Sequence, residues 1–110
     1  MVIRWISRLI SARKRRKLIK QIYETRQIVM VLTQEADKAL NNAKDYHESM
    51  EYWRRKCEKL GIPVLREPNY HYELDHCFEE LTIYKSLQQR IELNNRKITI
   101  LSDQLKSLSE

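Results

Sequence analysis

Five side chains of this sequence are of the types that bind transition metals in proteins: His47, Cys57, His71, His76 and Cys77. A structural zinc site needs four such ligands, usually in pairs separated by a few residues. His76 and Cys77 are adjacent, so on a helix they point about 100° apart, and His71 has an aspartate, not a second histidine, one turn further on. We therefore expect no metal site, with Cys77 packed in a helical interface and with His71 and His76 exposed to solvent.

The short motifs that carry catalytic or cofactor chemistry are also missing from the sequence. It contains no Gly-rich phosphate loop, no HExxH zinc motif and no nucleophile elbow, and Gly61 is its single glycine. Two cysteines do not make a disulfide scaffold, so Cys57 and Cys77 are expected to be reduced thiols. The sequence thus predicts a protein that is not an enzyme and that binds no cofactor.

Positive charge is concentrated at the start of the chain. The 110 residues carry a net charge of +6, but residues 1–20 hold eight Lys or Arg and no acid, which leaves a balance of −2 for the remainder. Any contact with a polyanion is therefore expected in the first 20 residues. One third of the residues are charged, with one Gly and two Pro, which is typical of long helices in a single small domain.

The spacing of the apolar residues predicts two long helices joined by one turn. The strong helix-breaking residues all lie in the segment GIPVLREPN, which starts at Gly61 and includes Pro68. On either side of it, apolar or small residues recur at alternating steps of four and three, as in a coiled coil, and we call this row the seam. It consists of Leu18, Ile22, Thr25, Val29, Leu32, Ala36, Ala39, Ala43, Tyr46, Met50, Trp53, Cys57 and Leu60, and of Leu74, Cys77, Leu81, Tyr84, Leu87, Ile91, Asn94, Ile98, Leu101, Leu105 and Leu108. We predict an all-α fold, an antiparallel two-helix coiled-coil hairpin with an N-terminal basic amphipathic helical extension. The predicted segments are the extension at 1–17, helix one at 18–60, the Gly/Pro turn at 61–70 and helix two at 71–108.

The turn also suggests a register for the hairpin. A turn centred near residue 65 pairs residue i of helix one with about residue 131 − i, so that Trp53 faces Phe78 and everything before Lys20 overhangs helix two. Small residues at 36, 39 and 43 leave the middle of the seam with little apolar area to bury. A lone hairpin of this kind is expected to be marginally stable, which favours either a homodimer or completion on a partner.

Within the extension, apolar and basic residues separate onto different faces of a helix. At 100° per residue the apolar side chains, which include Val2, span about 160° of the helix surface. We predict docking on a partner or a membrane through Ile3, Trp5, Ile6, Leu9 and Ile10. We predict contact with a polyanion through Arg4, Arg8, Arg13, Lys14, Arg15, Arg16 and Lys17.

Three kinds of surface could accept such a helix. An anionic membrane would take the apolar face into its acyl boundary and the basic residues onto its headgroups. A nucleic acid would use the basic residues but would give the apolar face no role. A groove on a protein would bury the apolar face and be approached with the help of charge, and this third interpretation is the one we favour from the sequence.

The sequence also bears on the compartment. Its longest uninterrupted apolar run, IVMVL at 28–32, is far shorter than the roughly 20 residues that span a bilayer. Arg4 and Arg8 interrupt the apolar region that a secretory signal requires, although the acid-free, Arg-rich start is similar to a mitochondrial transit peptide. We expect a cytoplasmic protein, with peripheral attachment to a membrane as the alternative.

Pro68 allows two interpretations. It can simply stop the turn and start helix two, as Pro often does at a helix N-terminus. The alternative hypothesis is that the bond from Glu67 to Pro68 samples both isomers and acts as a slow switch in an exposed loop.

A basic arm, a helical hairpin and a proline turn together resemble a group of short, helical, phage-encoded accessory proteins that bind the host RecBCD helicase-nuclease. The resemblance covers the full chain in size, charge distribution, helical build and position of the turn. It implies a protein partner, the RecC subunit in the co-opting type, no enzymatic activity and action in the host cytoplasm. We therefore predict a non-catalytic binding protein that modulates a host DNA-processing complex, with a peripheral membrane coiled-coil protein and a direct nucleic-acid binder as alternatives.

Overall fold

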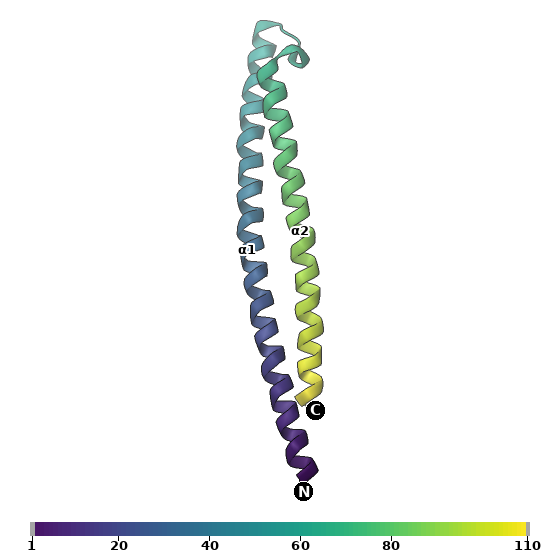
Figure 1. Cartoon of the computed structure of the whole chain (residues 1–110). Helices are drawn as coiled ribbons and strands as arrows, with labels where there is room; N and C mark the ends of the chain where they lie inside the picture. Colours follow the sequence, from purple (N-terminus) through teal and green to yellow (C-terminus); the bar gives the residue numbers. More distant parts are fainter. Residues whose placement is uncertain (1, 110) are drawn as a thin grey trace. The chain divides into compact units, whose positions relative to one another are not determined.

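The computed structural model of the chain describes residues 2–109 and contains two long helices (Figure 1). Helix α1 covers Val2–Leu60, a 3-10 turn η1 covers Val64–Arg66, and helix α2 covers Pro68–Ser109. The described residues include no β-strand. The predicted all-α helical hairpin is confirmed. The extension and helix one are parts of a single continuous helix, and α2 begins three residues before the predicted start at 71.

The chain divides into two compact units. The first unit combines α1 up to Leu32 with α2 from Arg90 onward, and the second unit is Thr33–Gln89. In each unit a segment of α1 lies beside a segment of α2 that runs in the opposite direction (Figure 1). Each unit therefore has its own interface between the two helices.

The predicted seam forms the core of both units. In the first unit the buried residues include Ile22, Leu32 and Leu101, and the hydroxyl of buried Thr25 donates to the carbonyl oxygen of Gln21 at 2.7 Å. The other predicted seam positions of the two units are buried or half-buried, with two exposed exceptions at Leu60 and Leu81. The buried residues of the second unit are mainly small. They are Ala36, Ala39, Ala43, Cys57 and Cys77, together with the larger Leu87. Among the described residues no large side chain is fully buried, so each core is narrow.

Glycine is required where α1 ends. Gly61 has a φ of 66°, in the left-handed region that L side chains rarely adopt. Its amide donates to the carbonyl of Glu58 at 3.3 Å, and the amide of Ile62 donates to the carbonyl of Cys57 at 3.0 Å. This pair of bonds is a Schellman motif, which satisfies carbonyls that the end of the helix would otherwise leave unpaired.

The start of α2 is fixed by Glu67 and Pro68. One carboxylate oxygen of Glu67 accepts from the backbone amide of Asn69 at 3.2 Å and from its side-chain amide at 2.9 Å. Pro68 is the first helical residue, where a missing N–H removes no helical hydrogen bond. A carboxylate at this end also interacts favourably with the helix dipole.

The register of the hairpin differs from the prediction. In the second unit the thiol of Cys77 donates to the carbonyl oxygen of Ala43 at 3.5 Å, so these two residues lie level with each other. The predicted register placed residue 88 opposite Ala43 and is wrong by about three helical turns. Phe78, which was expected to face Trp53, is 62% exposed.

The physical reason lies in the connection between the helices. Because antiparallel helices rise equally per residue, Pro68 lies level with Tyr52, nine residues from the Cys77 and Ala43 pair in each direction. α1 continues about two turns past that level, and the segment 61–67 returns along this part of it. A register counted from the centre of the turn ignores this returning segment.

Candidate functional site

The basic arm, defined here as residues 2–17 of α1, presents the most exposed apolar surface of the first unit. Ile3 is 83% exposed and Trp5 is 65% exposed, and the exposure of the other apolar residues predicted for docking, Ile6, Leu9 and Ile10, lies between 45% and 49%. Met1 lies outside the described residues, as does the side chain of Val2. All five predicted docking residues therefore lie on a helix with their apolar surface open to solvent.

The arm cannot continue the hairpin seam because its residues have the wrong phase. Counting back from Ile22 and Leu18 in steps of four and three, the seam positions become Arg15, Ser11, Arg8 and Arg4. The apolar residues of the arm are centred about 180° away from that line, on the opposite side of the same helix. Charged residues thus replace the core residues of the seam, and the apolar residues of the arm face solvent.

Basic side chains surround the arm and have no acidic partner. Residues 13–17 are five consecutive Arg and Lys, which point in all directions around a helix at 100° steps. All seven predicted polyanion contacts are exposed, and within residues 2–109 none of them forms an ion pair. The positive charge of the arm is therefore available to a partner.

The arm begins to meet α2 at its C-terminal end. Lys14, Lys17 and Leu18 line a shallow hollow together with Gln104 and Leu108 of α2. The predicted overhang, which extended to Lys20, is accordingly too long, since residues 14–18 lie beside the last turns of α2. The part of the arm that carries the five apolar residues takes no part in this contact.

The structure gives no support to a metal site at the His and Cys residues. No group of three potential ligands comes together among the described residues. Cys57 and Cys77 are both buried free thiols, as expected. His71 is exposed, and one ring nitrogen contacts the carbonyl oxygen of Leu65. His76 is half-buried, which corrects the expectation that it is exposed.

The burial of His76 comes from two tyrosines, a cluster that the sequence analysis missed. The ring of His76 stacks on Tyr46 of α1 with centroids 5.2 Å apart and meets Tyr72 edge-on at 4.2 Å. Its Nδ1 lies 3.3 Å from a carboxylate oxygen of Glu79. Desolvation raises the pKa of Tyr46, and the negative charges of Tyr72 and of neighbouring glutamates raise it further. The contact depends on the observed register, which the sequence did not predict.

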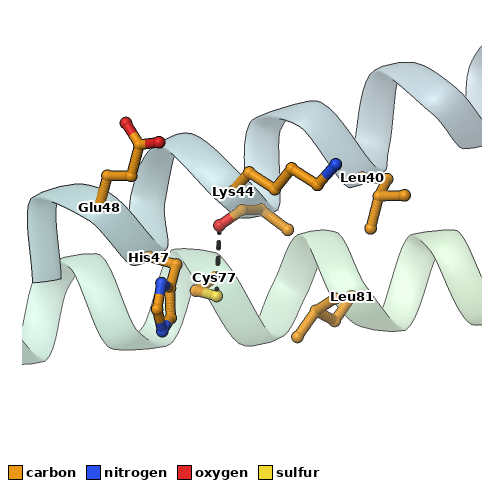
Figure 2. Close-up of a pocket in the computed structure, with 7 residues that line it drawn as sticks. Leu40, Lys44, His47, Glu48, Cys77 and Leu81 are labelled. Carbon is orange, nitrogen blue, oxygen red and sulfur yellow. Dashed lines mark hydrogen bonds between the residues drawn. The ribbon is translucent and has the colours of Figure 1, made fainter. Parts of the chain in front are cut away.

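A hollow of about 300 Å³ lies between the two helices of the second unit. Figure 2 shows Lys44, His47 and Glu48 of α1 around it, with the sulfur of Cys77 directed at the backbone of α1. Its floor is formed by small and aliphatic residues. The thiol is used in packing and is not presented to solvent.

The predicted switch at Pro68 stays a prediction. The described peptide bonds are all trans, including the bond between Glu67 and Pro68. Pro68 is exposed at the start of α2, where it has the ordinary role of a first helical residue.

Two further findings bear on function. No helix among the described residues has both the length and the apolar character to cross a bilayer. A comparison with models of protein families, with curated proteins and with solved structures finds no match to this chain. The functional argument therefore depends on the chemistry of the surface, and the basic arm is its strongest feature.

Proposed function

We propose that this chain is a non-catalytic binding protein that attaches through its basic arm to an anionic membrane surface. The observation that carries the proposal is the combination of a solvent-exposed apolar face with basic side chains that form no ion pair within residues 2–109. A membrane interface accepts both at once, because its acyl boundary takes the apolar side chains and its headgroups take the charges.

The expected contributions are large enough for reversible attachment. Complete burial of a side chain such as Ile or Leu stabilises by about 1.5–3 kcal/mol, and the residues of the arm would gain part of this. Each Lys or Arg close to an anionic leaflet adds about 1 kcal/mol. Stable attachment of a peripheral protein generally requires two contributions, and the arm supplies both an apolar face and a cluster of positive charges.

A nucleic acid and a second arm fit the basic arm less well than a membrane does. A nucleic acid would contact the basic side chains and leave Trp5 and Ile6 in water. An arm paired with a second arm would bring two uncompensated positive charges together. A protein groove with an acidic rim satisfies the same chemistry as a membrane, and the prediction of a host DNA-processing complex such as RecBCD belongs to this class.

Co-sedimentation of the full-length protein with lipid vesicles tests the proposal. We expect the protein to pellet with vesicles rich in anionic lipid, to remain in solution with purely zwitterionic vesicles, and to bind less as salt screens the charges. The double variant Trp5→Ser/Ile6→Ser removes apolar area from the arm and should abolish pelleting. The double variant Arg15→Glu/Arg16→Glu should reduce it strongly.

Matched controls lie on α2 in the same unit. Leu93 and Ile100 are 62% and 58% exposed, so Leu93→Ser/Ile100→Ser removes a similar exposed area outside the arm and should leave pelleting unchanged. The membrane proposal would be contradicted if the protein did not pellet with anionic vesicles but bound a stoichiometric complex of DNA-processing proteins from a nuclease-treated bacterial lysate. That result would support the protein-docking alternative.

A further inference from the structure

The outer face of α2 in the second unit carries a shallow apolar groove that no part of the hairpin fills. It is lined by Asp75, Phe78, Glu79, Thr82 and Ile83, all on α2. Phe78 is 62% exposed and Ile83 is 48% exposed, so two large apolar side chains stand in solvent here. The hydroxyl of Thr82 donates to the carbonyl of Phe78 at 2.9 Å. Asp75 and Glu79 supply the charged groups of the groove, and a carboxylate oxygen of Glu79 lies 3.3 Å from Nδ1 of His76.

The charge around this groove is the reverse of the charge on the arm. Residues 67–84 contain five acids and no Lys or Arg, whereas residues 1–20 contain eight Lys or Arg and no acid. Residues 33–53 of α1 and residues 69–89 of α2 together contain nine acidic and three basic residues. The sequence therefore contains one stretch whose Lys, Arg, Asp and Glu side chains are all positive, in the first unit, and one in which they are all negative, in the second unit. Each stretch carries exposed apolar side chains.

We propose that this groove on α2 binds the basic arm of a second copy of the chain. Asp75 and Glu79 are four residues apart, as are Arg4 and Arg8, so both pairs are spaced by about 6 Å along a helix. Two helices that lie against each other can then form both ion pairs at once.

Apolar residues also border both charged pairs. On the wheel of α2, Phe78 and Ile83 lie on opposite sides of the two carboxylates, and on the wheel of the arm Trp5 lies about 60° from Arg8. Contact would desolvate these three apolar side chains while opposite charges meet, an arrangement that specifies a partner and speeds encounter.

The inference goes beyond attachment to a membrane and competes with it for the same residues. Arg4, Arg8 and Trp5 cannot contact the groove of a second copy and a membrane at the same time. The protein therefore has an associated form in solution, which anionic membranes dissociate. Substitutions in the groove should weaken association and leave membrane attachment intact, whereas substitution of Trp5 should weaken both.

Sedimentation velocity of the nuclease-treated full-length protein over a range of concentrations measures the association. We expect dimers or larger species at about 0.05 M salt and a shift toward monomer at about 0.5 M salt, where screening is stronger. Arg4→Glu/Arg8→Glu and Asp75→Lys/Glu79→Lys should each weaken the association by about tenfold or more. A protein that carries all four substitutions should recover it, because the charges are exchanged and the pairs are kept.

A charge control and a membrane control accompany this experiment. Asp37→Lys/Asp45→Lys changes the net charge of the second unit equally, at exposed carboxylates of α1, and should leave association unchanged. Asp75→Lys/Glu79→Lys should still pellet with anionic vesicles. The inference is overturned if the wild-type protein is monomeric at low salt, or if the fourfold variant associates no better than the two double variants.

Discussion

The basic arm and the remainder of α1 are parts of one helix, yet the apolar residues serve different purposes in each. From Leu18 onward one row of them falls on the line that faces α2, where Leu32 is 4% exposed and Ala36 is 1% exposed. In the arm they lie on another side, and Ile3 is 83% exposed. The helix is continuous, so the phase of the pattern, not the frequency of apolar residues, decides whether a segment forms a core or a docking surface.

The largest expected difference between the two regions concerns stability. Leu32→Ala should lower the free energy of unfolding by about 2–5 kcal/mol, because it deletes a buried side chain and leaves a cavity. Leu9→Ala makes the same chemical change in the arm, where Leu9 is 47% exposed, and should change stability by less than about 0.5 kcal/mol. Urea denaturation followed by far-UV circular dichroism measures both, and equal losses would contradict the division of α1 into core and arm.

A second comparison adds bulk instead of removing it. Ala39 is 3% exposed in the seam of the second unit, so Ala39→Leu should separate the helices and cost about 1–3 kcal/mol. Ala12→Leu in the arm meets only solvent and should leave the unfolding midpoint where it is. An Ala39→Leu protein that is more stable than wild type would contradict the close packing of the two helices at this position.

The end of α1 provides an effect of intermediate size. An added Cβ at Gly61 meets no atom within 4 Å, so Gly61→Ala tests the backbone conformation alone. Because φ is 66°, the substitution should cost about 1 kcal/mol, measured as a shift of the urea midpoint. Gly61→Asn, whose side chain tolerates this conformation better, should cost less than Gly61→Ala. Equal costs for the two would argue against conformational strain as the cause.

The smallest expected effect is a pH dependence near the end of α1. The guanidinium of Arg54 donates to a carboxylate oxygen of Glu51 at 2.8 Å and lowers the pKa of that carboxyl below its ordinary value of 4.5. Since the pKa is lower in the folded chain, the stabilisation is present above the unfolded value and is lost as the pH falls through the folded value. Urea midpoints measured from neutral to acidic pH should fall slightly less steeply for Glu51→Gln than for wild type, and identical slopes would contradict a stabilising role for the pair.

The sequence predicted the features that depend on periodicity. The two helices, the seam and the solvent-exposed arm follow from the spacing of apolar residues and from the breakers around Gly61. The register could not be predicted, because nothing in the residues 61–67 shows that the connection returns along the end of α1. The stacking of His76 of α2 on Tyr46 of α1 was missed for the same reason, since it needs the register to bring the two residues together.

The central claim, that the arm docks apart from the hairpin, is tested most directly by the fluorescence of Trp5. Trp53 is the second tryptophan of the chain, so Trp53→Phe leaves Trp5 as a single reporter. On addition of anionic vesicles we expect its emission to shift to shorter wavelength and to resist a soluble quencher, with no change in the circular dichroism of the helices. Emission that stays at the wavelength of a water-exposed tryptophan at saturating anionic lipid would contradict the account.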